Sequence, residues 1–246
     1  MVEDDLAFGT LIQTWLKKKG FDVVRATSVK AALQLLNEDS KKDLILSDLR
    51  LPDHDGLTLL NWIQKYNMPI PFIVMTSYAE VQNAVLAMKS GATDYIAKPF
   101  HTEALQAVIG INGNTSEKPS DQKLNTVIPE QFRRLTAFAD DEEAALEIIK
   151  NVKLALNEHL QRLQNILDEA NNPTTNAADT PDIKSSITPI KQVVHKMLPI
   201  ATMMQMKSLD QLTALTPENI DKLDDKQIRE HLQTIMTDLH NILQDK

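Results

Sequence analysis

The 246-residue sequence contains no cysteine, and only 4% of its residues are aromatic. The absence of cysteine excludes disulfides, thiolate-bound zinc and cysteine nucleophiles. No hydrophobic run is long enough to cross a membrane, and the N-terminus lacks the pattern of a signal peptide. We therefore expect a soluble, cytoplasmic protein that makes no membrane contact.

An excess of basic residues is also missing, because the formal net charge is -8. A general nucleic-acid surface needs a basic stripe, so we expect no nucleic-acid partner. There is no glycine-rich nucleotide lid, which argues against the ATP-binding domain of a kinase. The hydrophobic fraction of 42% supports a sizeable core, and the length suits one large domain or two small ones.

The first half of the chain is organised around the stretch from Lys42 to Gly56. The apolar run Leu44–Leu46 is too short for a helix and is typical of a buried parallel strand. It ends at Asp48, and Pro52 and Gly56 mark the turn that follows. This pattern places the Asp48 carboxylate at the carboxyl end of a central strand, where ligands bind in open α/β sheets.

Strand and helix patterns alternate through residues 1–109. A helical pattern runs from Leu6 to Leu16 and ends at Gly20. Apolar runs then predict strands at 21–26, 44–48, 71–75 and 93–97. Helices are expected after a cap at Thr27 or Ser28 and at 56–66, 79–89 and 102–108. This alternation predicts a doubly wound α/β fold with a five-stranded parallel sheet. Only Met1 and Val2 precede Glu3, so we expect a truncated first strand, unpaired backbone groups beside it, and a sequence that begins late or is a piece of a longer protein.

Polar side chains follow several of these predicted strands: Glu3, Asp4, Asp48, Thr76 and Lys98. The carboxyl ends of parallel strands meet at one edge of a sheet, so these side chains should converge. Clustered carboxylates repel one another and need a cation, and Mg²⁺ prefers oxygen ligands. Each residue alone could be a helix cap or a solvated charge, but the five together favour phosphoryl transfer to a carboxylate.

Residues 1–109 resemble the receiver domain of bacterial two-component response regulators, which has a flavodoxin-like fold. The matching motifs are Glu3-Asp4-Asp5, Ser47-Asp48 with Pro52 and Gly56, Met75-Thr76-Ser77, and Asp94-Tyr95-Ile96-Ala97-Lys98-Pro99-Phe100. The resemblance implies that Asp48 accepts a phosphoryl group from the phosphohistidine of a histidine kinase or hybrid kinase. Such a domain would phosphorylate and dephosphorylate itself.

The same resemblance implies a role for each site residue. Mg²⁺ would be held by Asp4, Asp48 and the backbone carbonyl of Arg50, with Glu3 reaching it through water. Thr76 would bond the new phosphate and Lys98 would pair with it. Tyr95 would be the aromatic residue that reorients on activation, although a half-buried strand aromatic is the ordinary reading of this position.

Residues 110–127 are rich in polar and small residues and predict a flexible linker. Residues 128–246 show only helical periodicity, with a short helix near 129–138 and a capping box at Asp140 and Glu143 that opens a long helix. After a break at 171–181, further helices are expected at 189–206, 209–215 and 225–244. This pattern predicts an all-α four-helix bundle as a second domain.

The candidate reactive residue of the second half is His195, in the segment His195-Lys196-Met197-Leu198-Pro199. It lies beside an apolar stripe, and Lys191 or Lys196 could screen a phosphate on its imidazole. His159, His231 and His240 are expected to be ordinary residues at the helix surface or at helix ends. The segment resembles the histidine phosphotransfer domains at the C-termini of hybrid sensor kinases, whose usual lysine and glycine are replaced here by Leu198 and Pro199.

The two resemblances together imply a phosphorelay protein that passes phosphate through His195 to a downstream response regulator or phosphotransfer protein. The alternative is a phosphorylation-dependent binding switch whose helical half is a docking or dimerisation module. A sensor kinase and a transcription factor are less favoured, and the chain could be a fragment of a larger hybrid kinase.

Overall fold

The computed structural model describes residues 1–39, 41–77, 81–110, 128–139, 141–171 and 183–244. The chain divides into two compact units. The first, which we call the α/β unit, comprises 1–126 and 136–148. The second, the helical unit, comprises 127–135 and 149–246. The predicted linker lies outside the described residues from position 111 onward, and most of the predicted break at 171–181 does too.

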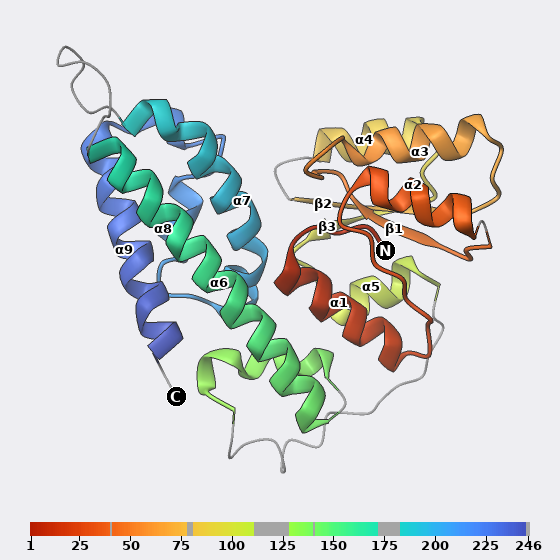
Figure 1. The fold of residues 1–246 in the computed structure, drawn as a ribbon, viewed down its shortest axis with the longest axis horizontal. Coiled ribbons are helices and arrows are strands. Elements are labelled where there is room, and N and C mark those ends of the chain that lie inside the picture. The colour runs from red at the N-terminus through yellow and green to blue at the C-terminus, as the bar shows by residue number, and fades with distance from the viewer. Residues whose placement is uncertain (40, 78–80, 111–127, 140, 172–182, 245–246) are drawn as a thin grey trace. The chain divides into compact units, whose positions relative to one another are not determined.

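The α/β unit alternates helices and strands, as the sequence predicts (Figure 1). Its elements are α1 (Leu6–Lys18), α2 (Val29–Glu38), β1 (Ile45–Asp48), α3 (Gly56–Lys65), β2 (Phe72–Ser77), α4 (Val81–Lys89), β3 (Asp94–Lys98) and α5 (Thr102–Val108). The strands form a parallel sheet in the order β1-β2-β3. In Figure 1, α1 and α5 lie on one face of this sheet and α2, α3 and α4 on the other.

The described residues form three strands, so the five-stranded sheet is not confirmed. The predicted strand at 21–26 is wrong beyond a single bridge between Ala26 and Val2. Val2 also bridges Ser47: its amide donates to the carbonyl of Leu46 (2.8 Å), and its carbonyl accepts from the amide of Asp48 (2.9 Å). A strand needs a neighbouring run of residues to pair with, and within the described residues the bridge to Val2 is the pairing that this segment makes.

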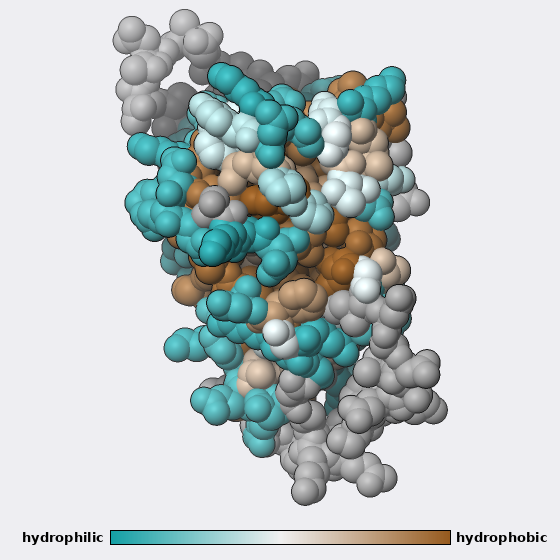
Figure 2. All heavy atoms as spheres, turned by 90° about the vertical axis from the view of Figure 1, so that its right-hand side faces the viewer, coloured by the Kyte–Doolittle hydropathy of each residue, from teal (hydrophilic) through white to brown (hydrophobic). Residues whose placement is uncertain are grey.

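A hollow of about 370 Å³ lies beside Met1 and Val2. Segments 20–26 and 41–46 line it, and the Met1 ammonium donates to the carbonyl of Val24 at its edge (2.9 Å). Burial lowers the pKa of this amino group to about 6, helped by Lys42 and Arg25. Figure 2 shows hydrophobic residues gathered across the middle of the face that is on the right in Figure 1, the side on which β1 begins.

The helices α1 and α2 begin at residues whose side chains satisfy the first backbone amides. The carboxylate of Asp5 accepts from the amide of Phe8 (2.7 Å) at the start of α1. The hydroxyl of Ser28 accepts from the amide of Ala31 (3.1 Å) in α2. The core between α2, α3 and the sheet is fully apolar: Val29, Leu49, Leu59, Leu60, Ile63 and Val74. These contacts hold the ends of the strands in place.

From residue 128 onward, the described residues contain helices and turns and no strand. The elements are η2 (Glu130–Phe138), α6 (Glu142–Asn171), η3 (Ile183–Ser186), α7 (Ile187–Met204), α8 (Leu209–Ala214), η4 (Ile220–Lys222) and α9 (Asp225–Gln244). α8 has only six residues, and the four-helix bundle stays a prediction. No helix in the described part of the chain has the length and apolar character needed to span a membrane.

The apolar periodicity of α7 and α9 is confirmed by burial. The predicted inner face of α7 is entirely buried: Ile190, Val193, Val194, Met197, Ile200, Ala201 and Met204. The same holds for the predicted face of α9: Ile228, Leu232, Ile235, Leu239 and Ile242. The predicted cap Asp140 lies outside the described residues, but the carboxylate of Asp141 accepts from the amide of Ala144 (2.8 Å).

Candidate functional site

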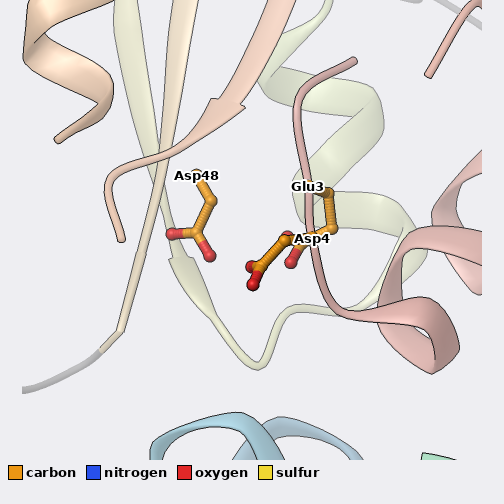
Figure 3. A group of neighbouring side chains, drawn as sticks. All are labelled: Glu3, Asp4 and Asp48. Atoms are coloured by element: carbon orange, nitrogen blue, oxygen red, sulfur yellow. The ribbon is translucent and has the colours of Figure 1, made fainter. Parts of the chain in front are cut away.

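Three carboxyl groups meet at the carboxyl edge of the sheet. Glu3 and Asp4 come from the loop before α1, and Asp48 is the last residue of β1. One oxygen of each group lies within 4.8 Å of the others, and Figure 3 shows the groups of Asp4 and Asp48 turned toward a shared space. Glu3 and Asp48 are buried, whereas Asp4 is half-buried. The convergence predicted from the strand ends is therefore present.

Lys98, at the end of β3, contacts two of these carboxyl groups. Its buried ammonium lies 2.5 Å from Glu3 Oε2 and 2.7 Å from Asp48 Oδ2. The ring of Phe8 packs against it, with the centroid 4.7 Å from the nitrogen. Burial lowers the pKa of Lys98, but Asp48 and Glu3 together raise it more, so the lysine is charged. The following Lys98–Pro99 peptide bond is cis.

Glu3 is the most enclosed acid of the cluster, with 1% of its surface exposed. Its Oε1 accepts from the amide of Asp5 (3.1 Å), and its Oε2 accepts from Lys98. Burial raises the pKa of Glu3 to about 7, against the lowering effect of Lys98 and with the help of the Asp48 charge. Glu3 is therefore a buried partner of Lys98, and Asp4 is the acid nearer to solvent.

The loop after Asp48 is held by its own backbone. Asp48 Oδ1 accepts from the amide of Arg50 (3.3 Å), and the carbonyl of Leu49 accepts from the amide of Gly56 (2.7 Å). A Cβ atom at Gly56 would overlap the carbonyl oxygen of Asp48. The sequence pattern identified Gly56 as a turn residue, but this close approach is the stronger reason for glycine.

The two remaining residues predicted for the receiver site occupy different environments. Thr76 is fully buried on β2, one residue beyond Met75, which pairs with Asp48 across the sheet. Tyr95 lies on β3 beside Val74 and is 40% exposed. Thr76 therefore belongs to the same sheet edge as the acids. The switching role of Tyr95 stays a prediction.

Two other acids of the Asp48 loop are helix caps, which is the ordinary reading of such residues. The carboxylate of Asp53 accepts from the amides of Val29 (3.0 Å) and Lys30 (2.8 Å), at the start of α2. The carboxylate of Asp55 accepts from the amide of Leu57 (2.8 Å), at the start of α3. Sequence spacing did not reveal the contact of Asp53, because its partners lie more than twenty residues away.

His195 is half-buried on α7, beside the buried stripe of that helix. Lys196 is also half-buried, and Lys191 forms an ion pair with Asp221, 3.1 Å from both carboxylate oxygens. Pro199 lies inside α7 and has no N–H to donate to the carbonyl of His195, four residues earlier. The charge of Lys191 is thus already engaged, and Lys196 is the cation nearer in sequence to the imidazole.

The other helix histidines differ from one another. The expectation of a surface position for His159 is wrong, because only 6% of its surface is exposed within α6. His231 is half-buried and His240 exposed, with His240 Nδ1 3.0 Å from the carbonyl of Met236. The apolar face of α6 is wider than its leucine spacing indicated, and it includes His159.

A family model described as "Response regulator receiver domain" matches residues 1–110. These residues are a response regulator receiver domain. The transcriptional regulatory protein ZraR of Escherichia coli K12 is 38% identical over 109 residues, which are 44% of this chain and 24% of ZraR. The regulatory protein AtoC of the same organism is 34% identical over 109 residues, 44% of this chain and 23% of AtoC. The chain spans about a quarter of the length of these relatives.

Solved receiver structures are also similar to this domain. The HemR receiver domain of Leptospira biflexa is 32% identical, with 46% of this chain and 93% of that one covered and a TM-score of 0.41. The signal receiver domain of a LuxO repressor protein of Vibrio parahaemolyticus is 31% identical, with 44% and 83% covered and a TM-score of 0.42.

Two expectations can be weighed against these relatives. Receiver domains generally bind Mg²⁺ at an acidic pocket, and the carboxylates of Glu3, Asp4 and Asp48 are the hard oxygen ligands that this ion prefers. The expected absence of a nucleic-acid partner has no support here, because ZraR is named a transcriptional regulatory protein.

Proposed function

We propose that this receiver domain takes a phosphoryl group onto Asp48 from the phosphohistidine of a histidine kinase in the cytoplasm. The observation that carries the proposal is the grouping of Glu3, Asp4 and Asp48 within 4.8 Å, with the Lys98 ammonium in contact with two of them. A carboxylate oxygen of Asp48 attacks the phosphorus, and an acyl phosphate forms as the P–N bond breaks. The kinase imidazole leaves with its electron pair and gains a proton.

The residues around Asp48 have two kinds of role: some hold or supply positive charge, and one donates a hydrogen bond. Asp4, Asp48 and the backbone carbonyl of Arg50 would hold Mg²⁺, with Glu3 reaching it through water. Mg²⁺ bound there supplies positive charge to the phosphoryl oxygens. Lys98 adds a second fixed positive charge, and the hydroxyl of Thr76 donates to a phosphoryl oxygen.

The test of this proposal is phosphorylation of the full chain by a labelled small phosphodonor, with and without Mg²⁺. The Asp48→Asn variant should incorporate no label, and wild-type labelling should require the ion. Asp53→Asn is the matched control, because Asp53 lies in the same loop but caps α2, and it should be labelled like the wild type. Label that persists in Asp48→Asn, or labelling without a divalent ion, would overturn the proposal.

We further propose that the helical unit carries phosphate on His195 and passes it to a downstream response regulator or phosphotransfer protein. The half-buried imidazole beside Lys196 supports this role. A ring nitrogen of His195 attacks the phosphorus of an aspartyl phosphate, the carboxylate leaves, and a phosphohistidine forms. A neutral imidazole is nucleophilic at physiological pH and needs access more than activation.

The relay is tested with a phosphorylated response regulator as donor. Acid-labile, base-stable label should appear in the wild type and be lost in His195→Gln. His240→Gln is the control, because that histidine is exposed on another helix of the same unit. If His195→Gln still passes phosphate onward, the second carrier is wrong.

One observation favours the alternative of a phosphorylation-dependent binding switch. Leu154 is 47% exposed on α6, in the part of this helix that belongs to the helical unit. A large apolar side chain exposed on a helix suits a docking or dimerisation surface. Phosphate-dependent self-association of the His195→Gln variant, measured by sedimentation, would support this reading over the relay.

A further inference from the structure

Arg25 lies against the loop that carries two of the clustered acids. Its Nε donates to the backbone carbonyl of Glu3 (3.0 Å), and its Nη2 donates to the backbone carbonyl of Asp5 (2.6 Å). The guanidinium therefore binds the backbone on both sides of Asp4. Because the two donors form one rigid plane, they fix the distance between these carbonyl groups.

Gly9, the fourth residue of α1, has no side chain and so leaves space for this contact. A Cβ atom at position 9 would lie 2.5 Å from Nη2 and 2.6 Å from Nε of Arg25, well inside van der Waals distance. Glycine destabilises a helix interior relative to alanine, so a helical glycine needs a packing reason. Gly9 is buried, and the guanidinium that covers it supplies that reason.

Arg25 can act on the acidic cluster in two opposite ways. As a hydrogen-bonding fork it fixes the loop, which should strengthen the binding of a cation by Asp4 and Asp48. As a positive charge coupled to Glu3, Asp5 and Asp4 it should weaken the attraction of the cluster for a cation. The two effects predict opposite results when the arginine is replaced, so they can be separated.

We propose that Arg25 is a positioning residue whose fork holds the Glu3–Asp5 loop in the geometry that binds a divalent cation, with Gly9 as the space that admits it. This inference rests on the proposed cation site. It assigns Arg25 no contact with the phosphoryl group. The positioning effect exceeds the charge effect, because the two hydrogen bonds act directly on the backbone that carries the ligands.

The experiment measures Mg²⁺ affinity of the full chain by titration calorimetry, in the wild type, Arg25→Lys and Arg25→Met. Loss of the two guanidinium hydrogen bonds should weaken the binding of Mg²⁺ about tenfold in both variants. Lys30→Met removes an exposed cation of the same unit and should bind like the wild type. If charge decides, Arg25→Lys will match the wild type and Arg25→Met will bind more tightly, which would overturn the inference.

Gly9→Ala tests the other side of the same contact. It should weaken Mg²⁺ binding to a similar extent, and it should add nothing in the Arg25→Met background, because the group it displaces is already absent. At saturating Mg²⁺ the rate of phosphorylation should return to within twofold of the wild type, which separates positioning from general damage. Additive losses in the double variant would contradict a shared contact.

The outcomes also separate this inference from the proposed function. If the wild type binds no Mg²⁺, the cation site itself is wrong. If the wild type binds the ion and Arg25→Lys, Arg25→Met and Gly9→Ala bind it equally well, only the role of Arg25 is wrong.

Discussion

The α/β unit and the helical unit hold their candidate reactive residues in different settings. Asp48 is buried at a strand end, where a lysine and two further carboxyl groups from distant parts of the chain surround it. His195 is half-buried on a single helix, with its nearest candidate cation next to it in sequence. A carboxylate needs neighbours that offset charge before it can hold a phosphoryl group, whereas an imidazole needs mainly access.

This difference has a consequence for mutation. Residues around Asp48 support both the fold and the proposed reaction, so replacing them should change both. His195 itself is only half-buried, so replacing it should change the proposed reaction with little effect on stability. Substitutions in the two units test this contrast.

Lys98→Met should have the largest effect. It leaves the buried carboxyl groups of Glu3 and Asp48 without their cation, and breaking a buried pair in this way costs about 3–5 kcal/mol. Urea denaturation of the α/β unit measures the loss. Lys191→Met in the helical unit is the control, because its partner Asp221 is largely exposed, and it should cost less than about 1 kcal/mol. Equal losses of stability in Lys98→Met and Lys191→Met would show that the two units do not differ in this way.

The pH dependence of stability should report on Glu3. Its pKa is raised to about 7 in the folded protein, above the ordinary value of 4.5, so the folded state binds the proton more tightly. The contribution is fully present below pH 4.5 and is lost as the pH rises through about 7. In metal-free protein this contribution to the unfolding free energy is about 3 kcal/mol.

The unfolding free energies of the wild type and of Glu3→Gln are measured across pH 4.5–8, and one is subtracted from the other. The other titrating groups are the same in both proteins, so their contributions cancel in this difference. The wild type should lose stability relative to Glu3→Gln as the pH rises. A flat difference would show that Glu3 does not titrate in this window.

Gly56→Ala should have an intermediate effect. The added Cβ would overlap the carbonyl oxygen of Asp48 and force the loop or the start of α3 to move, at a cost of about 1–3 kcal/mol. Phosphorylation of Asp48 should slow as well. Gly20→Ala is the control: it has a positive φ of 87° but no atom within 4 Å of the added Cβ, so it should cost only backbone strain of about 1 kcal/mol and leave phosphorylation unchanged.

His195→Gln should have the smallest effect on stability, below about 0.5 kcal/mol, because the side chain is half-exposed. Labelling of Asp48 by a small phosphodonor should not change. Thermal unfolding and the labelling rate together check this. A loss of several kcal/mol would mean that His195 is a structural residue of the helical unit.

The parts that the sequence predicted well depend on simple geometry. Parallel strands place their carboxyl ends at one edge, so the positions of Glu3, Asp48 and Lys98 after apolar runs were enough to predict their meeting. A helix places every third or fourth residue on one face, which was enough to predict the buried sides of α7 and α9.

The parts that it missed depend on partners far along the chain. The run 21–26 has strand composition, but a strand forms only beside another, and Val2 alone is there to pair with Ala26. His159 was expected at the surface because the width of the buried face of α6 cannot be read from leucine spacing. The contacts of Arg25 with Gly9, and of Gly56 with Asp48, arise from close approach in three dimensions.

The capping of α2 by Asp53 has a mechanical consequence. Asp53 lies five residues after Asp48, and its hydrogen bonds to Val29 and Lys30 tie the loop beyond β1 to the first turn of a different helix. Any rearrangement of that loop on phosphorylation must either carry the start of α2 along or break those bonds. The hydrogen-exchange rates of the Val29 and Lys30 amides would therefore show whether these hydrogen bonds to Asp53 break or persist on phosphorylation.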